Sequence, residues 1–377
     1  MNNMGKKILY VVTEDWFFCS HFLDRAVAAR GAGYEVIVAA REGTHAEAIH
    51  QAGLTFIPVN FHRRGTNLFH EAATFLQLRK VYRQQQPDIV HHVALKPILY
   101  GSLAALLERK PFIVNAPVGM GFVFTSRRLL ARVLKPMVMF AMRHLLNPRR
   151  SKVIFENKDD LGAAIQQKIV RAECAELIRG AGVDTDVIEV RPEPPGPVRI
   201  VLAARMLWDK GVGEFVEAAR MVKRTFPDAR FQLVGAPDEG NPASVSDAQL
   251  LTWQKEGAIE WLGQRSDVPA ILADSHIACL PSYREGLPKF LLEALAAGRA
   301  VVATDVPGCR EAVEPGVNGL RVPARECAPL AEGLMQLIVD NETRQRFGKN
   351  GRLRAEAEFS AKRIIGETLA LYRRVIA

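Results

Sequence analysis

The sequence lacks any run of about 18 uninterrupted apolar residues, the length that a membrane-spanning helix needs. Yet 48% of its 377 residues are hydrophobic, so it can bury sizeable cores, and its length favours two domains over one. The apolar run Ile8–Val12 follows two lysines but is short and meets Thr13-Glu14-Asp15 at once, with no small-residue cleavage site. We therefore predict a buried first strand there and no signal peptide.

Cysteine is also scarce. The five cysteines are odd in number, scattered, and form no Cys-x-x-Cys pair. This usage indicates a reducing compartment and argues against a disulfide framework or a zinc site. We expect no bound metal.

The chain has no excess of acidic residues, and its formal net charge is +9. Residues 1–190 hold 25 Lys and Arg against 17 Asp and Glu, whereas residues 191–377 hold 25 against 24. An anionic partner is therefore expected on the first half. Nucleic acid is not the expected partner, because the basic residues lack interleaved aromatics and any recognisable binding motif.

Short β-branched runs alternate with helical stretches along nearly the whole chain. Such alternation predicts parallel sheets with helices on both faces, an α/β fold. The expected strands of the first half are Ile8–Val12, Glu35–Ala39, Phe56–Val59, Ile89–His92, Phe112–Asn115 and Val153–Phe155. Those of the second half are Arg199–Ala203, Arg230–Val234, Ile259–Leu262, Ile277–Leu280, Ala300–Ala303 and Gly319–Val322.

A proline-rich segment separates the two series. Four prolines lie within residues 191–197, which can continue neither a helix nor a central strand. We predict a linker there, between a doubly wound domain of residues 1–190 and a second of residues 198–359. Such domains bind ligands at the carboxyl ends of their strands.

The most informative stretch runs from Pro281 to Gly298, after an expected strand and into a helix. Glu285 lies in the turn and Glu293 lies eight residues on, about two helical turns along the same face. Carboxylates at these places can accept hydrogen bonds from sugar and ribose hydroxyls. The amides of Gly286, Leu287 and Lys289 begin the helix and can receive phosphate oxygens.

A second element follows the first strand of the second half. Arg205 leaves that strand and Lys210 comes five residues later, before a helix. Arg can hold a diphosphate through two parallel hydrogen bonds, and Lys adds a compact charge. Either element alone is more often a solvated surface, but their occurrence together, each after a strand, favours a diphosphate site. We assign Arg205, Lys210 and Glu285 to catalysis: the two cations stabilise a departing diphosphate electrostatically, and Glu285 orients the sugar.

With these motifs the chain resembles glycosyltransferase family 4, the retaining, metal-independent enzymes with the GT-B fold of two facing Rossmann-like domains. In that family Arg-x4-Lys and Glu-x7-Glu bind the nucleotide-sugar donor. The resemblance therefore assigns donor contacts to four residues, the donor tetrad: Arg205, Lys210, Glu285 and Glu293. The family seats its base near residues 261–268, which implicates Leu262 and Arg265. Residues 304–311 and 316–320 agree as well. The resemblance also implies that a helix of residues 360–377 crosses back to the first domain.

The detailed sequences of residues 234–242 and 281–288 resemble those of one sub-group of the family. Enzymes of this sub-group often move a hexose or N-acetylhexosamine from a UDP donor to a sugar on undecaprenyl diphosphate. His91 and Lys96 match a His…Lys pattern of similar enzymes, and an acceptor diphosphate would suit both. A partly buried histidine beside an exposed lysine explains them equally well. Asn115 opens a segment in which many members carry a histidine beside the reacting sugar; here that position is Val118, while Gly119 permits close backbone approach.

Residues 126–152 hold eight Lys and Arg, Arg127 and Arg128 among them, with no acidic residue and with apolar residues between the charges. This pattern favours an interfacial helix on an anionic membrane, at the cytoplasmic face of the inner membrane, and contact with a lipid diphosphate. A scaffold helix with a solvated basic face is the alternative. Other activities also remain open at this point: a nucleotide-sugar epimerase, or a scaffold that binds the nucleotide sugar without catalysis.

Overall fold

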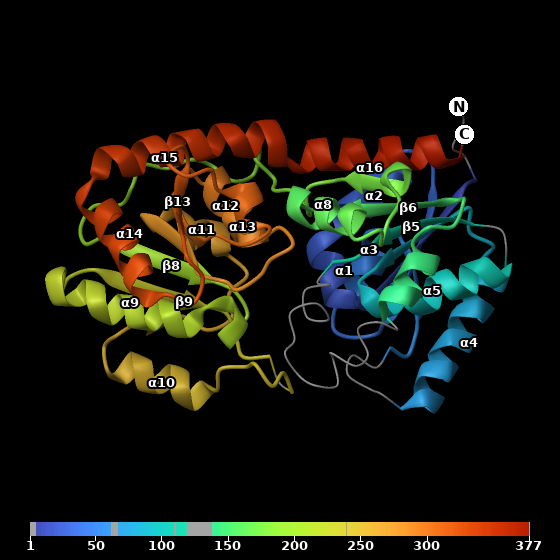
Figure 1. The fold of residues 1–377 in the computed structure, drawn as a ribbon, viewed down its shortest axis with the longest axis horizontal. Coiled ribbons are helices and arrows are strands. Elements are labelled where there is room, and N and C mark those ends of the chain that lie inside the picture. The colour runs from blue at the N-terminus through green and yellow to red at the C-terminus, as the bar shows by residue number, and fades with distance from the viewer. Residues whose placement is uncertain (1–4, 62–66, 109–110, 119–137, 239, 377) are drawn as a thin grey trace. The chain divides into compact units, whose positions relative to one another are not determined.

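The computed structural model describes residues 5–61, 67–108, 111–118, 138–238 and 240–376 (Figure 1). The chain forms two compact units, one of Met1–Ala181 with Arg363–Ala377 and the other of Gly182–Lys362. The first unit thus ends before the boundary expected at residue 190, and it includes the C-terminal residues. Each unit is an α/β domain with a parallel sheet, so the predicted fold class is confirmed.

The first unit contains a seven-stranded parallel sheet in the order β3-β2-β1-β4-β5-β6-β7. All six predicted strands are present, and β7, which is short and only half-buried, was not predicted. The strands are β1 (Lys7–Glu14), β2 (Glu35–Arg41), β3 (Thr55–Pro58), β4 (Ile89–Val93), β5 (Phe112–Ala116), β6 (Ser151–Phe155) and β7 (Ala175–Leu177). The apolar runs of the five inner strands are buried on both faces because helices cover both sides, whereas the edge strands β3 and β7 are partly exposed.

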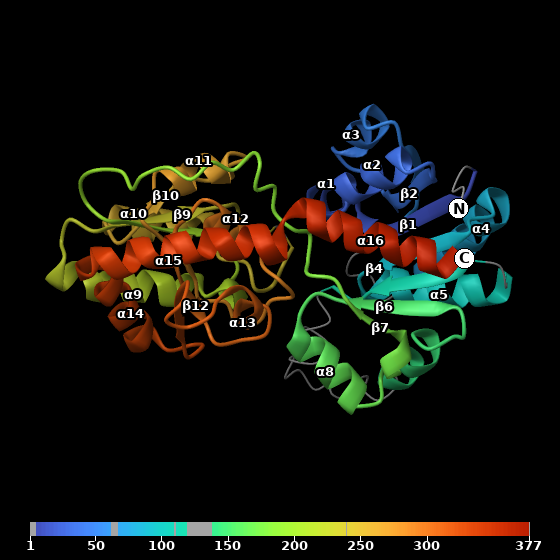
Figure 2. The ribbon, with the colours of Figure 1, turned by 90° about the horizontal axis from the view of Figure 1, so that it is seen from above.

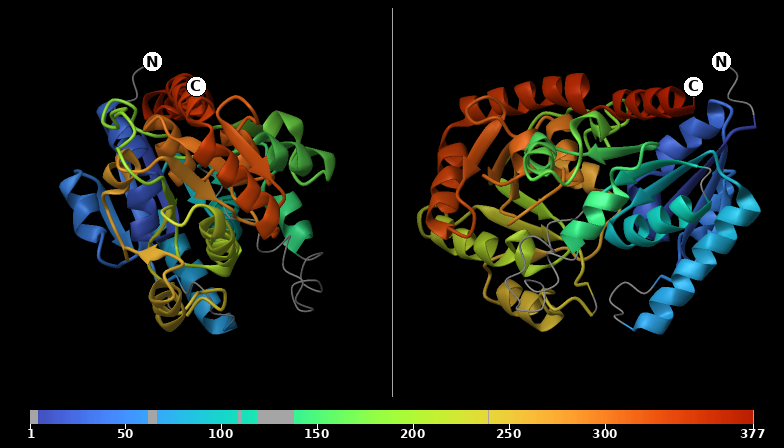
Figure 3. Two further views of the ribbon diagram at one scale, coloured as in Figure 1. Left: turned by 90° about the vertical axis from the view of Figure 1, so that its left-hand side faces the viewer. Right: turned by 45° about the vertical axis from the view of Figure 1, so that its right-hand side comes forward.

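Two sets of helices cover the first sheet. The core on one face includes side chains of α1 (Asp15–His21), α2 (Leu23–Gly31), α3 (Ala46–Gln51) and α16 (Ala361–Ile376). The core on the other face includes α4 (Leu68–Gln85) and α5 (Leu95–Glu108), which lie side by side in the right-hand view of Figure 3. Residues 138–145 are helical, and α8 (Lys158–Gln166) and the 3-10 turn Ala172–Cys174 precede β7.

The C-terminal helix α16 is part of the first unit's core and lies over its sheet in Figure 2. Ile364, Leu371 and Tyr372 are completely buried on one side of it, as the apolar stripe of an amphipathic helix requires. The Tyr372 hydroxyl lies 2.7 Å from the Tyr10 hydroxyl and 2.6 Å from Nδ1 of His91. The helix is thus held by polar contacts as well as by apolar packing.

The second unit contains a six-stranded parallel sheet in the order β10-β9-β8-β11-β12-β13, and every strand was predicted. The strands are β8 (Arg199–Ala203), β9 (Arg230–Val234), β10 (Glu260–Trp261), β11 (Ile277–Leu280), β12 (Ala300–Thr304) and β13 (Gly319–Val322). Figure 1 shows α9 (Val212–Thr225) and α15 (Asn341–Arg354) on opposite sides of this sheet. The other helices are α10 (Asp247–Lys255), α11 (Val268–Ala273), α12 (Lys289–Ala296), α13 (Cys309–Ala312) and α14 (Cys327–Val339), with the turn Trp208–Lys210 and the π-helical residues Ala355–Phe359.

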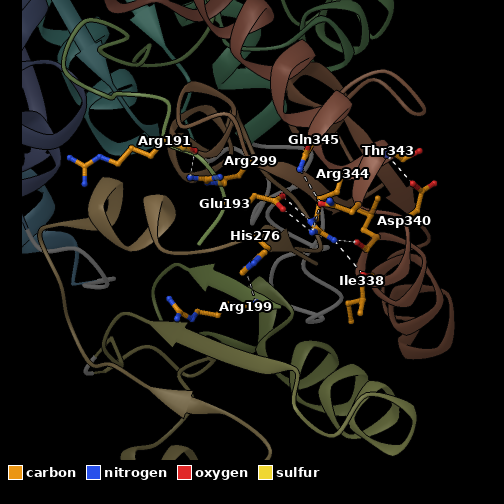
Figure 4. Close-up of polar contacts among 12 residues, drawn as sticks. Arg191, Glu193, Arg199, His276, Arg299, Ile338, Asp340, Thr343, Arg344 and Gln345 are labelled. Carbon is orange, nitrogen blue, oxygen red and sulfur yellow. Dashed lines mark hydrogen bonds and ion pairs between the residues drawn. The ribbon is translucent and has the colours of Figure 1, made fainter. Parts of the chain in front are cut away.

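The segment expected to be a linker is fastened to the second unit (Figure 4). Glu193 accepts hydrogen bonds from Nε and Nη2 of Arg344, at 2.8 and 2.7 Å, and Arg344 is buried. The buried Arg299 donates to the main-chain oxygen of Arg191 at 2.8 Å. Prolines do end the preceding structure, but two buried arginines make these residues part of a domain.

Candidate donor-binding site

The centre of the second sheet is a topological switch point. β8 and β11 are neighbours there, and the chain leaves them toward opposite edges of the sheet. In doubly wound folds the loops that follow two such strands diverge, so that a ligand can bind between them at the carboxyl edge. Arg205 and Lys210 lie in the loop after β8, and Glu285 lies in the loop after β11. The fold therefore brings the two sequence elements together.

The two loops are in direct contact. The amide of Tyr283 donates to the main-chain oxygen of Asp209 at 3.0 Å. Gly211 has a φ of +73°, and a Cβ built on it would lie 2.1 Å from the main-chain oxygen of Pro281. Only glycine permits both this backbone conformation and this approach. The contact fixes the position of Lys210, the residue just before Gly211.

Lys210 and Glu285 form an ion pair at this place. Nζ of Lys210 donates to both carboxylate oxygens of Glu285, at 2.6 and 2.8 Å. The hydroxyl of Ser282 donates to Oε1 of Glu285 at 2.6 Å, and the hydroxyl of Thr304 donates to the main-chain oxygen of Ser282. The Glu285 side chain is 9% exposed and that of Lys210 is 21% exposed. The carboxylate is therefore rigidly oriented, and the ammonium keeps some access to solvent.

Arg205 is more open. Its side chain is 43% exposed, and Nη1 donates to Oδ2 of Asp238 at 2.6 Å. Asp238 lies in the loop after β9, the strand beside β8. A guanidinium and an ammonium thus leave one strand end, each held by a carboxylate from a different loop. Both cations have further N–H donors that suit a multivalent anion.

Helix α12 carries the other predicted donor residues. The helix begins at Lys289, and Pro288 at its N-cap position makes no side-chain capping hydrogen bond. Leu287, which precedes the helix, is buried. A Cβ on Gly308 would lie 2.5 Å from the main-chain oxygen of Gly286, which shows how closely the loop is packed there. Gly286 and Leu287 therefore precede the helix and do not begin it as predicted, whereas the amide of Lys289 lies in the first turn, whose direction suits a phosphate.

Glu293 lies on α12 with 15% of its side chain exposed. Burial raises its pKa, and Nζ of Lys289, 3.8 Å away, opposes that shift. A carboxyl group of this kind is suited to accept hydrogen bonds from a neutral diol, because such a ligand adds no charge to the buried site.

Leu262 and Arg265 follow β10. The amide of Leu262 donates to the main-chain oxygen of Leu233 at 2.9 Å, which extends the ladder beyond the strand. Arg265 is exposed and makes a two-bond ion pair with Asp267, at 2.8 and 2.5 Å. The structure thus places Leu262 on a fixed backbone at the carboxyl edge and leaves Arg265 engaged with a near neighbour.

Comparisons with known proteins agree with this geometry. Residues 184–354 match the family described as Glycosyl transferases group 1, and residues 7–157 match Glycosyl transferase 4-like. An N,N'-diacetylbacillosaminyl-diphospho-undecaprenol alpha-1,3-N-acetylgalactosaminyltransferase of Campylobacter jejuni is 30% identical over 91% of this chain and 92% of its own length. The chain is a family 4 glycosyltransferase.

Two further similarities concern the glycosyltransferase as a whole. A UDP-Gal:alpha-D-GlcNAc-diphosphoundecaprenol alpha-1,3-galactosyltransferase of Escherichia coli is 23% identical over 82% of this chain and 81% of its own. HepE of Anabaena, solved in complex with UDP, superposes with a TM-score of 0.79 over 98% of this chain and all of its own, at 19% identity. The latter shows the shared GT-B fold.

The residues predicted for the acceptor are placed differently from expectation in the first unit of the glycosyltransferase. His91 is completely buried beneath α16, its Nδ1 bonded to Tyr372. Asn115 is also buried, and its Oδ1 lies 2.8 Å from Nδ1 of His92. Nζ of Lys96 donates to Glu71 at 2.5 Å. The two strand residues point into the core because their positions in β4 and β5 have helices over both faces.

Three predicted acceptor residues, Gly119, Arg127 and Arg128, lie outside the residues that the structure describes. Val118 is half-buried, packs against the core beneath α16, and donates from its amide to the main-chain oxygen of Ala116 at 2.8 Å. In the described part of the basic segment, Met142 and Leu146 are buried in the core. One side of this helical portion therefore packs in the core, whereas the side chain of Phe140 on the same portion is 65% exposed.

Sequence reasoning missed the residues that hold Arg205, Lys210 and Glu285 in place: Gly211, Asp238, Ser282 and Thr304. Asp238 and Ser282 stand in motifs that the sequence does single out, after β9 and β11, but their partners are set by the folded loops. Nothing in the sequence ties Thr304 to Ser282. In the described residues, no three His, Cys, Asp or Glu side chains gather as a metal site would require, and no helix has the length and apolarity to cross a membrane.

Proposed function

We propose that this glycosyltransferase moves a hexose or N-acetylhexosamine from a UDP-sugar to a hydroxyl group of a polyprenyl-diphosphate-linked sugar. The observation that carries the donor half is the Lys210–Glu285 pair at the switch point of the second sheet, with Arg205 leaving the same strand. The acceptor half is supported by the names of the Campylobacter jejuni and Escherichia coli relatives, both of which act on diphospho-undecaprenol-linked sugars.

In the proposed mechanism Arg205 and Lys210 bind the donor diphosphate and neutralise the charge that develops as the bond from the anomeric carbon to the phosphate oxygen breaks. Glu285 orients the donor sugar, and Glu293 accepts hydrogen bonds from the ribose. The acceptor oxygen forms the new bond on the face that the diphosphate leaves, and the acceptor proton passes to the departing phosphate oxygen. The anomeric configuration is retained, and the two cations take the place of a metal ion.

The first test is nucleotide release from UDP-, GDP- and ADP-sugars, with and without polyprenyl-diphosphate-linked sugar acceptors. We expect one UDP-sugar to be consumed only with one acceptor. Release without an acceptor would indicate hydrolysis, and conversion of the donor sugar would indicate epimerisation. Binding of UDP with no reaction across many acceptors would favour a non-catalytic scaffold. Any of these three outcomes would contradict transfer.

The second test replaces Lys210 with alanine. We expect kcat to fall by about 100- to 1,000-fold, because one stabilising charge is lost at the leaving group. Lys255→Ala is the matched control, since Lys255 lies exposed at the end of α10 and is not one of the residues assigned to the donor site. A Lys210→Ala enzyme with unchanged kcat would remove the basis of the mechanism.

The proposal includes peripheral contact with an anionic membrane, at its cytoplasmic face, through residues 126–152. In the described part of that segment, Phe140 and Arg143 are exposed. We expect sedimentation with vesicles that contain phosphatidylglycerol, decreasing as salt is raised. Phe140→Ser should weaken it, whereas Phe69→Ser, which removes an exposed phenylalanine on α4, should not. Equal binding by both variants would exclude this surface.

A further inference from the structure

The guanidinium of Arg205 is held at Nη1. In the part of the chain that the structure describes, Asp238 is the one acceptor recorded for its guanidinium, and the bond uses Nη1. Guanidinium has five N–H donors in a fixed fork. The Nε–Nη2 edge, whose two parallel N–H groups match two phosphate oxygens, is therefore not used by these protein groups.

Asp238 is the fixed member of this pair. Its side chain is only 11% exposed, and Asn241 donates a second hydrogen bond to Oδ2 at 3.3 Å. The main-chain amide of Asp238 donates to the hydroxyl of Ser244 at 3.0 Å. These contacts do not involve Arg205, so the backbone and the carboxylate of Asp238 each have a partner besides the guanidinium.

The loop that carries Asp238 is joined to the segment that carries Arg205. The amide of Met206 donates to Ala236 at 3.0 Å, and the amide of Val245 donates back to Met206 at 2.9 Å. Leu207 and Ser244 form an antiparallel bridge. The loop after β9 thus lies along the residues next to Arg205, and its backbone sets the distance between the two side chains.

We propose that Asp238 is a positioning residue: it fixes the guanidinium of Arg205 so that the Nε–Nη2 edge meets the donor diphosphate. This rests on the proposed function, in which Arg205 binds that diphosphate. A free arginine side chain loses rotamer freedom when it binds, and a pre-oriented one has already lost it. The opposite role, in which Asp238 occupies Arg205 until the nucleotide displaces it, predicts tighter nucleotide binding when the carboxylate is removed.

The experiment measures the dissociation constants of UDP and UMP for the full chain and for Asp238→Asn. We expect UDP to bind about 3- to 10-fold more weakly, the range that one immobilised side chain accounts for, and UMP to change less. In an Arg205→Ala background, Asp238→Asn should have no further effect. Asp238→Glu keeps the charge and should restore part of the loss. Glu256→Gln is the control, because it breaks an exposed Arg220–Glu256 pair in the same unit.

Three results would overturn the inference. Tighter binding of UDP by Asp238→Asn would assign it the competing role. An equal loss for UDP and UMP that persists in the Arg205→Ala background would make the residue a support of the loop alone. Failure of the unmodified chain to bind UDP would refute the proposed function, and with it this role of Asp238. This outcome is distinguishable from the other two because it is measured on the unmodified chain, before any variant is made.

Discussion

Replacing Glu193 with alanine should destabilise the second unit, because it leaves a buried guanidinium without its carboxylate. Arg344 is 5% exposed, and Glu193 supplies two of its hydrogen bonds. Removing one partner of a buried ion pair costs about 3–5 kcal/mol. The remaining bonds from Arg344 to the main-chain oxygen of Leu337 at 2.6 Å and to Asn341 at 2.7 Å reduce the penalty. We expect a loss of about 2–4 kcal/mol in the free energy of unfolding.

Urea denaturation followed by tryptophan fluorescence suits this prediction. Three of the four tryptophans, Trp208, Trp253 and Trp261, lie in the second unit, and Trp16→Phe removes the fourth. With a urea dependence of about 2 kcal/mol per molar, the midpoint should fall by about 1–2 M. Urea is preferable to guanidinium chloride, whose ions would screen the pair.

The control is again Glu256→Gln, which breaks an exposed ion pair in the same unit and should cost about 0–1 kcal/mol. A midpoint for Glu193→Ala that matches this control would refute the reasoning. It would mean that residues 191–197 are not fastened to the second unit in solution and behave as the linker that their prolines suggest.

Three further predictions use other features. Gly211→Ala should reduce kcat strongly, because the added Cβ would meet the main-chain oxygen of Pro281. Gly257→Ala is the control: Gly257 has a similar positive φ (+74°) with no atom within 4 Å of the added Cβ, so this variant should lower stability and spare activity. Equal activities of the two variants would refute the prediction. Tyr372→Phe should lower the first unit's stability by about 1–3 kcal/mol, measured by urea denaturation, because two buried polar groups lose a partner; no change would contradict it. Burial lowers the pKa of His92 to about 4, so the unfolded chain binds more protons below pH 6.5, and His92 alone should lower stability by about 2 kcal/mol at pH 5. The neighbouring His91, whose pKa burial also lowers, adds to this fall. His92→Gln should flatten this dependence in denaturation at pH 7 and 5, and an unaltered slope would exclude the assignment.

Most of the strands were predictable because they are short β-branched runs between turn residues, and burial on both faces leaves such runs no alternative role. Of the set Arg205, Lys210, Glu285 and Glu293, the approach of Lys210 to Glu285 was predictable because strand ends determine where such residues emerge in a parallel sheet. Whether these four bind a donor stays a prediction until it is measured.

Other features could not be predicted from local sequence. β7 was missed because Ala175–Leu177 carries no alternating or apolar pattern; its place comes from pairing with β6. One of the two interpretations of His91 had it face a ligand because it lies near a strand end, but the helix that covers it lies some 280 residues later in the chain. The Asp238–Arg205 contact likewise depends on two loops that only the folded sheet brings together.

The chain enters the first unit twice, and this has a consequence for how the protein is made. Residues 363–376 are synthesised after the whole second unit, yet Leu371 and Tyr372 fill the first unit's core. Until they emerge from the ribosome, Tyr10, His91 and the apolar side chains around them have no cover. The second unit, a single continuous stretch, can complete its core first. The order of folding is therefore expected to run opposite to the order of synthesis, with the nascent first unit in need of protection from aggregation.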